Sequence, residues 1–309
     1  MTLDDWKKKL GGGRYLEAGG CRFHYARMGQ GRGGGAPTVL LIHGWPEFWL
    51  AWRKNMPVLA KSFDVIAPDL RGFGESRSTD RPADALLTPD IIADDLIAFL
   101  DTLGLGRVAV AAHDVGAQAA QALAKKVPER IAGLFFFNCP YGGIGKRWAD
   151  PESMPETWYQ YFNQLPMAPL LAGLNRNACR LYFGHILSHW SHDPDTFAGD
   201  LDLWVDNFMA PGALEGGFAW YRGVDGIRRG MVRRAMAGDW PDADPNPIAH
   251  PTCIRWGEHD PVLRAGWMDS LGGWFSSLDA AVAPSAGHFV HYETPDAANA
   301  WMVEFFSRL

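Results

Sequence analysis

The chain has 309 residues, of which 47% are hydrophobic and 21% are charged, as is typical of a globular protein with one large domain or one domain carrying an insertion. Lys and Arg number 29 against 35 Asp and Glu, so the net charge is −6, and the absence of a basic run argues against a nucleic-acid partner. No uncharged apolar run reaches membrane-spanning length, which argues against a membrane partner.

The first ten residues, MTLDDWKKKL, lack the apolar core of a signal peptide. The four cysteines are scattered without C-x-x-C spacing, which is typical of idle thiols in a reducing compartment. We therefore expect a cytoplasmic protein. Whether it is a monomer or a homodimer is left open by these patterns.

Residues 13–28 alternate between apolar and polar around Gly19 and Gly20, a pattern that predicts a β-hairpin. The glycine-rich residues 29–37 come next. They lack the G-x-x-x-x-G-K-[ST] spacing of a phosphate-binding loop, and we expect a flexible loop there.

A regular alternation of strands and helices begins at residue 38. The apolar runs TVLLI and FDVIAPDL are typical of strands buried on both faces. A helix is expected to follow, with Thr88 as its cap and Pro89 in its first turn. The remaining expected elements are strands over 107–114 and 131–138, a helix between them over 117–126, strands over 252–260 and 278–288, and a closing helix over 296–309.

This alternation predicts an α/β fold with a mostly parallel sheet covered by helices on both faces. The connection between Cys139 and Pro251 is far longer than such a fold requires, and it is rich in aromatic residues and helical patterns. We expect residues 1–140 and 229–309 to form the core, and residues 141–228 to form an inserted helical cap over the strand ends.

Asp114 stands where the strand RVAVAAH ends and the next helix begins. The segment Ala112-His113-Asp114-Val115-Gly116 has the small-x-nucleophile-x-small form of a strained turn that projects its central side chain outward. An aspartate at this place is also a favoured helix cap. The pattern by itself is compatible with both interpretations.

Further candidate residues follow other expected strands. The segment HGWPEFW begins at His43, directly after the strand TVLLI, and the backbone N–H groups of Trp45 and Val115 are candidates for an oxyanion hole. Asp260 and His288 each come just past a strand. The order nucleophile, acid, histidine is the one expected in this fold class. Two rivals for the histidine, His259 and His291, fit the strand-end geometry less well.

Five segments match motifs of one family in place: HGWPEFWLAWR, PDLRGFGESRS, AHDVGAQAA, WGEHDPV and GHFVHYETP. With them the chain resembles the α/β-hydrolase fold, and within it the branch of epoxide hydrolases and hydrolytic dehalogenases that uses an aspartate nucleophile. The resemblance covers nearly the whole chain. It extends into the expected cap, whose segments are similar to those of bacterial epoxide hydrolases. It implies a catalytic set of Asp114, Asp260 and His288.

In epoxide hydrolases of this kind, one tyrosine from each of two cap segments donates a proton to the epoxide oxygen. The resemblance implies that Tyr159 in WYQYFNQLPMA and Tyr221 in GGFAWYRG have this role. Tyr161 could replace Tyr159, depending on the phase of the helix. The expected substrate pocket is completed by His43, Pro46, His113, Trp158 and Phe162.

The implied reaction opens an apolar epoxide to a vicinal diol with water as the second reactant and no cofactor. A carboxylate suits it because attack at a saturated carbon then produces an ester, which the enzyme can hydrolyse, whereas serine would produce an ether. Asp114 needs no activating base, since an ordinary aspartate is ionised above about pH 4.

The alternative functions are a haloalkane or haloacetate dehalogenase and a non-catalytic binder of apolar ligands. Val115 and Gln118 stand where those dehalogenases carry tryptophan or arginine, although tryptophan N–H donors in the cap keep dehalogenation possible. We expect no metal. His185, His189 and His192 have helical spacing, but we expect them on a partly buried helix rather than around an ion.

Overall fold

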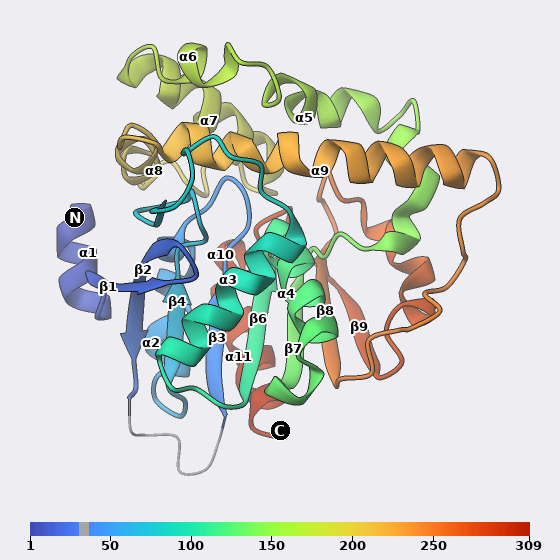
Figure 1. The fold of residues 1–309 in the computed structure, drawn as a ribbon, viewed down its shortest axis with the longest axis horizontal. Coiled ribbons are helices and arrows are strands. Elements are labelled where there is room, and N and C mark those ends of the chain that lie inside the picture. The colour runs from blue at the N-terminus through green and yellow to red at the C-terminus, as the bar shows by residue number, and fades with distance from the viewer. Residues whose placement is uncertain (31–36) are drawn as a thin grey trace.

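A computed structural model describes residues 1–30 and 37–309 (Figure 1). Most of the glycine-rich segment expected to be a loop, residues 31–36, lies outside the described residues. The described chain forms a 9-stranded sheet in the order β1-β2-β4-β3-β6-β7-β8-β9, with β5 paired to β2. Its strands are β1 (Arg14–Ala18), β2 (Cys21–Met28), β3 (Thr38–Ile42), β4 (Val65–Pro68), β5 (Arg77–Ser78), β6 (Val108–His113), β7 (Ile131–Phe137), β8 (Thr252–Gly257) and β9 (Leu278–Ala283).

The predicted hairpin is confirmed as the antiparallel pair β1 and β2. The pairs from β4 through β9 are all parallel. In this register Ile42 lies beside Ala112 and His113 lies beside Phe137. The carboxyl ends of β3, β6 and β7 therefore meet at one edge of the sheet, where the candidate motifs come together.

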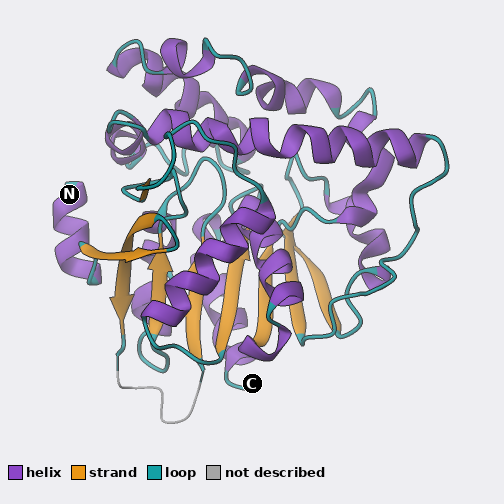
Figure 2. Ribbon diagram, in the orientation of Figure 1, coloured by secondary structure: helices purple, strands orange, loops and turns teal. Residues whose placement is uncertain are grey.

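Helices cover both faces of the sheet, as predicted (Figures 1 and 2). On one face lie α3 (Pro89–Thr102) and α4 (Val115–Lys126), and on the other lie α2 (Met56–Leu59) and α11 (Pro295–Phe306). Thr88 caps α3 as predicted, because its side chain accepts a hydrogen bond from the Ile91 N–H. The strands between these layers are apolar on both faces, and every residue of β6 and β7 is buried.

A helical layer lies over the carboxyl edge of the sheet and is built from the residues between β7 and β8 (Figure 1). The layer contains α5 (Trp158–Phe162), α6 (Ala168–Ala172), α7 (Arg176–Trp190), α8 (Leu201–Phe208) and α9 (Ala213–Met236). The 3₁₀ segments η3 (Gly142–Ala149) and η4 (Met154–Thr157) lead into it from β7. None of the described helices is long and apolar enough to cross a membrane.

The expected cap boundary at residue 228 falls inside α9, which continues to Met236. Gly226 and Gly230 weaken a helix locally, but the arginines, methionines and alanine around them are strong helix formers. The division into cap and core remains a prediction. The remaining described helices and 3₁₀ segments are α1 (Leu3–Leu10), η1 (Trp49–Lys54), η2 (Pro128–Arg130), η5 (Ala265–Gly273) and α10 (Val290–Glu293).

Candidate active site

Asp114 occupies a strained turn between β6 and α4. Its φ of 47° and ψ of −119° lie in a region that residues with a side chain rarely adopt. The tight turn explains Gly116, because a Cβ there would lie 2.3 Å from the carbonyl oxygen of His43. Although Asp114 stands at the N-cap position, its side chain makes no capping hydrogen bond. The interpretation of Asp114 as a helix cap is therefore wrong at the level of the side chain.

The side chain of Asp114 instead points to the loop after β3. Its Oδ2 atom accepts a hydrogen bond of 3.1 Å from the backbone N–H of Trp45. Burial raises the pKa of Asp114, and the charges of His288 and His113 together with the N–H groups of Trp45 and Val115 oppose that rise. The two N–H groups expected to form an oxyanion hole thus both stabilise negative charge at this carboxylate.

His288 and Asp260 form a buried pair. The Nδ1 atom of His288 lies 2.8 Å from Oδ2 of Asp260, and Oδ1 of Asp260 accepts hydrogen bonds of 2.8 and 2.9 Å from the N–H groups of Val262 and Leu263. Burial alone would lower the pKa of His288, but the carboxylate of Asp260 raises it to about 9, and Asp114 also contributes. The Nε2 atom of His288 has no hydrogen-bond partner among the described residues. It is therefore free to exchange a proton with a reactant.

Asn138 is a part of this site that the sequence patterns did not identify. It follows β7, has a left-handed φ of 41°, and donates a hydrogen bond through Nδ2 to Oδ2 of Asp260. Its Oδ1 accepts from the Gly257 N–H at 3.1 Å. Asn138 therefore fixes the orientation of the carboxylate that holds His288. Its position directly after a central strand is the signal that could have revealed it.

The two rival histidines lie elsewhere. The ring of His259 is exposed and stacks on His192 with the ring centroids 4.1 Å apart. The Nε2 atom of His291 lies 3.0 Å from Oε1 of Glu47, and neither histidine contacts Asp260 through its ring. Of the three candidates, His288 alone is paired with the acid.

The tyrosines expected in the cap come together from α5 and α9. The rings of Tyr159 and Tyr221 are buried, with centroids 5.5 Å apart, and both pack on the indole of Trp45. Burial raises the pKa of both hydroxyl groups, and the charge of Asp114 raises both further. Tyr161 is 57% exposed, because two positions along a helix rotate a side chain to the opposite face. The geometry therefore favours Tyr159 over Tyr161.

A cavity of about 320 Å³ lies between α9 and the sheet edge. Asp114, Val115, Tyr159 and Tyr221 line it. The rest of its wall is predominantly aromatic and apolar and consists of Pro89, Gln118, Gln121, Pro140, Tyr141, Gly142, Trp148, Gln160, Trp220, Val224, Ile227, Arg228, Met231, Leu263, Trp240 and Trp274. This volume suits a small organic molecule.

The five additional residues expected in the pocket do not line this cavity, and that prediction is corrected. His43 is buried and accepts the N–H of Leu70 at Nε2, and the carbonyl of Pro46 accepts the indole N–H of Trp204. The ring of His113 is hydrogen-bonded to Glu47 and to the carbonyl oxygen of His288. Trp158 is 39% exposed and packs against Phe162, which is partly buried one helical turn along α5.

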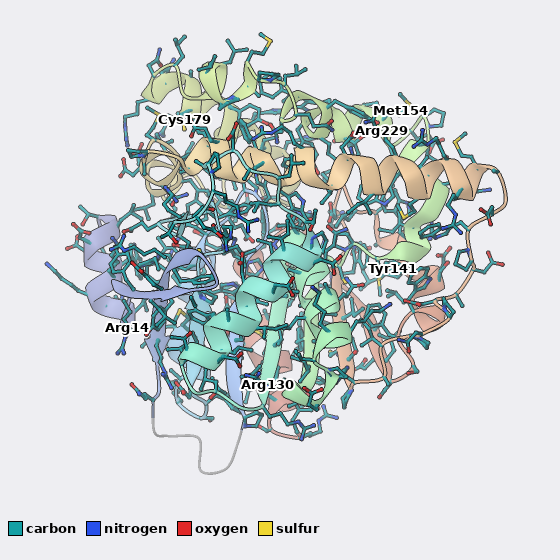
Figure 3. The ribbon with its side chains drawn as sticks, viewed as in Figure 1. Arg14, Arg130, Tyr141, Met154, Cys179 and Arg229 are labelled. Carbon is teal, nitrogen blue, oxygen red and sulfur yellow. The ribbon has the colours of Figure 1, made fainter. Side chains whose placement is uncertain are left out.

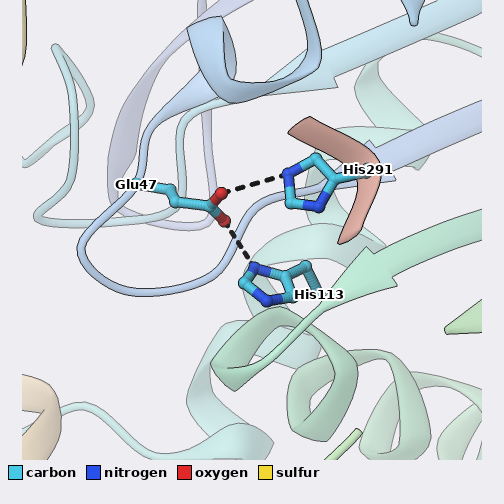
Figure 4. A group of neighbouring side chains, drawn as sticks. All are labelled: Glu47, His113 and His291. Carbon is cyan, nitrogen blue, oxygen red and sulfur yellow. Dashed lines mark hydrogen bonds and ion pairs between the residues drawn. The ribbon is translucent and has the colours of Figure 1, made fainter. Parts of the chain in front are cut away.

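Glu47, His113 and His291 form a fully buried cluster that the sequence patterns did not predict (Figure 4). Oε2 of Glu47 lies 2.7 Å from Nδ1 of His113 and accepts the N–H of Gly44 at 2.8 Å. Nε2 of His113 lies 2.8 Å from the carbonyl oxygen of His288. One carboxylate thus connects the loop after β3, the strand before Asp114 and the segment after His288.

The cluster brings together ligand types that also bind metals, with all donor atoms within 4.8 Å of one another. Burial would raise the pKa of Glu47, but the two histidines hold it well below its usual value. Glu47 and His113 are joined by a hydrogen bond of 2.7 Å, and Nε2 of His291 lies 3.0 Å from the other carboxylate oxygen.

The helical histidines do not converge on one point. The rings of His185 and His189 stack with centroids 5.5 Å apart, whereas Nε2 of His189 bonds to Glu156 and His192 stacks on His259. His185 and His189 lie on α7 as expected, whereas His192 lies beyond the end of that helix at Trp190, and that part of the expectation is wrong. The four cysteines are buried and free.

Comparison with known proteins places this geometry in a family. The chain is 26% identical over 290 residues to human Epoxide hydrolase 4, a match that covers 92% of this chain and 75% of the relative. It is 28% identical over 298 residues to the soluble epoxide hydrolase of Corynebacterium sp. strain C12, with 94% and 95% covered. The resemblance to epoxide hydrolases indicated by the motifs is thereby confirmed.

Solved structures agree. Wild-type Cfl2 from Burkholderia cenocepacia superposes with a TM-score of 0.78 at 26% identity, over 95% of each chain. The epoxide hydrolase CorEH superposes with a TM-score of 0.76 at 25% identity, over 96% of this chain and 98% of that one. A family model described as the alpha/beta hydrolase fold matches residues 37–295. The chain therefore belongs to the α/β-hydrolase fold family.

Proposed function

We propose that this protein is an epoxide hydrolase that opens an apolar epoxide to a vicinal diol through a covalent ester on Asp114. One observation carries the proposal. The carboxylate of Asp114, on a strained turn, faces the Trp45 N–H and lines a cavity together with two buried tyrosines. A hydrogen-bonded pair of His288 and Asp260 completes the arrangement. The named epoxide hydrolases among the similar proteins support it.

The first half of the reaction forms the ester. An oxygen of Asp114 attacks one ring carbon, and the bond between that carbon and the epoxide oxygen breaks. The epoxide oxygen takes a proton from Tyr159 or Tyr221, both of which remain protonated at neutral pH because their pKa values are raised. The Gln160 side chain donates a hydrogen bond of 3.1 Å to the Tyr159 oxygen, which leaves the proton of that tyrosine free for the epoxide.

The second half hydrolyses the ester. His288 takes a proton from water at Nε2, the water oxygen attacks the carbonyl carbon of the ester, and the Trp45 and Val115 N–H groups hold the resulting oxyanion. When the intermediate collapses, His288 returns its proton to the departing alkoxide and completes the diol. The proton left on Asp114 restores the tyrosine, so the net reaction consumes one epoxide and one water.

The pKa of His288 should change between these two halves of the reaction. The charge of Asp114 is one of the causes that hold the pKa of His288 at about 9. Formation of the ester removes that charge, and the pKa of His288 then falls toward the range of an effective general base. His288 becomes a better base at the stage of the reaction that requires one.

A hydrolytic dehalogenase is the second candidate, and one observation favours it. The indole N–H of Trp45 is buried beside the site and has no hydrogen-bond partner among the described residues. A halide ion leaving a saturated carbon is stabilised by such donors and needs no proton. The same aspartate, histidine and ester would serve this reaction.

The test is a substrate panel. Purified protein and its Asp114→Ala variant are incubated separately with styrene oxide, bromobutane and chloroacetate, and the vicinal diol and free halide are quantified. We expect diol from styrene oxide with wild-type protein alone and no halide release. Halide release without diol would establish the dehalogenase instead, and tight binding without turnover of any substrate would indicate a non-catalytic binder.

A further inference from the structure

Two of the side chains that line the cavity are charged. One is Asp114, the proposed nucleophile, and the other is Arg228, which lies on α9 seven residues after Tyr221. The other lining side chains are neutral and include four tryptophans, Trp148, Trp220, Trp240 and Trp274. A cation held among aromatic walls, apart from the nucleophile, is not required by any step of the proposed reaction.

Arg228 lies on the same face of α9 as the proposed proton donor. Residues seven positions apart on a helix are separated by two turns, so the backbones of Tyr221 and Arg228 are about 10 Å apart along the helix axis. Val224 and Met231 lie on this face and also line the cavity. Tyr221 and Arg228 therefore border the same cavity two helical turns apart.

The guanidinium group of Arg228 is under-partnered. Its side chain is 14% exposed, and its nearest carboxylate oxygen, on Asp225, is 3.8 Å away, beyond hydrogen-bond distance. The other oxygen of Asp225 bonds to Arg229, so these three side chains carry one net positive charge. The Nη2 atom of Arg228 is buried and donates no hydrogen bond to any residue within 1–30 or 37–309.

The guanidinium also lies over the ring of Tyr161, whose centroid is 5.6 Å from its central carbon. Such a cation–π contact orients the group without satisfying its N–H donors. A buried donor without an acceptor is costly, and a planar fork of N–H groups matches a carboxylate with two parallel hydrogen bonds. The free donors therefore point to an anionic group as their natural partner.

We propose that Arg228 is a specificity-determining residue that binds a carboxylate at the far end of an aromatic epoxide. This inference rests on the proposed function and names its substrate class: an aryl epoxide with a carboxylate on the opposite side of the aryl group from the epoxide. The tryptophans contact the aryl group, Asp114 attacks the epoxide carbon, and Arg228 fixes the other end. The lone positive charge also favours entry of an anionic substrate into a cavity that contains an ionised nucleophile.

The experiment compares two substrates that differ in one group, phenyl glycidyl ether and its 4-carboxylate. The variants are Arg228→Met, which keeps the length but removes the charge, Arg228→Lys, which keeps the charge, and Arg229→Met as a matched control. Arg229 is 65% exposed and lies on the side of α9 away from the sheet, whereas Tyr141, which lines the cavity, lies on the sheet side (Figure 3).

We expect Arg228→Met to reduce kcat/KM for the carboxylate substrate by about 10- to 100-fold, mainly through KM, because a buried hydrogen bond to a charged group is lost. The loss for phenyl glycidyl ether should be clearly smaller, because that substrate has no carboxylate for Arg228 to bind, and Arg228→Lys should retain part of the preference. Arg229→Met removes the same charge from outside the cavity, so it should leave phenyl glycidyl ether unchanged and reduce kcat/KM for the carboxylate substrate by less than Arg228→Met does. The diol of the carboxylate substrate should inhibit wild-type protein competitively, and added salt should weaken that inhibition.

An equal loss on both substrates would overturn the inference, because it would show that Arg228 only supports the packing of α9. So would a wild-type protein that does not prefer the carboxylate substrate, or inhibition by the carboxylate diol that salt and Arg228→Met leave unchanged. These outcomes differ from a failure of the proposed function, in which wild-type protein would form no diol from either glycidyl ether.

Discussion

Glu47→Gln tests whether one buried carboxylate holds the catalytic loops together. The substitution keeps the shape of the side chain but removes its charge. One carboxylate oxygen of Glu47 accepts hydrogen bonds from the Gly44 N–H and His113 at 2.8 and 2.7 Å, and the other faces Nε2 of His291 at 3.0 Å. Glutamine can present an acceptor oxygen to only one of these two sides. Leaving a buried hydrogen-bond partner unsatisfied typically costs about 1–3 kcal/mol, and more where one group is charged, so we expect a loss of about 3–5 kcal/mol in the free energy of unfolding.

For a chain of this size we expect the melting temperature to fall by on the order of 5–10 °C. Thermal and urea unfolding, followed by circular dichroism, measure the change, and Glu258→Gln is the control because that carboxylate is exposed. The kcat should fall while KM stays unchanged, since Glu47 does not line the cavity. If the two variants unfold alike, within about 0.5 kcal/mol, the reasoning is refuted.

Three further predictions concern the reaction itself. Tyr221→Phe should slow ester formation by roughly 100-fold, because it removes a proton donor, whereas Tyr161→Phe should leave the rate unchanged. Stopped-flow tryptophan fluorescence measures both rates, and equal effects would count against Tyr221 as a proton donor. Asn138→Gly preserves the left-handed backbone but loses the hydrogen bond to Asp260. Ester hydrolysis alone should therefore slow by roughly 10- to 100-fold. A slower ester formation would contradict the role of Asn138 in orienting Asp260. Because burial raises the pKa of Asp114, the rate of ester formation should fall as the pH drops through a value above 3.8. The rate of ester hydrolysis should rise with pH through a pKa of His288 below about 9. Single-turnover rates across pH measure both, and a rate that does not depend on pH would refute these pKa shifts.

Most of the strands and their mostly parallel arrangement were predictable because they depend on local patterns. Apolar runs buried on both faces predicted β3 and β6, and the parallel register then brought their carboxyl ends to one edge. Asp114, Asp260 and His288 could be proposed as a set because they follow β6, β8 and β9.

The cavity wall could not be predicted, because it depends on side-chain directions and on packing between distant segments. Trp158 and Tyr159 are neighbours on a short helix, yet one is exposed and the other buried. Trp240 and Trp274 line the cavity from beyond the expected cap, where no motif marks them.

The Glu47 cluster shows the same limit. Its three members are far apart in the sequence, and His113 and His291 each stand beside a stronger candidate for function. Their contacts with Glu47 become visible only in the folded chain. A buried hydrogen-bond network of this kind leaves no periodic pattern in the sequence.

The central claim is that Asp114 becomes covalently esterified, and the most direct measurement uses His288→Ala. This variant retains the nucleophile and both tyrosines but lacks the general base for hydrolysis. Incubated with styrene oxide, it should gain the mass of one epoxide molecule, and peptide mapping should locate the added mass on Asp114. A folded His288→Ala protein that binds styrene oxide yet shows no such mass in the intact-protein spectrum would contradict the covalent mechanism.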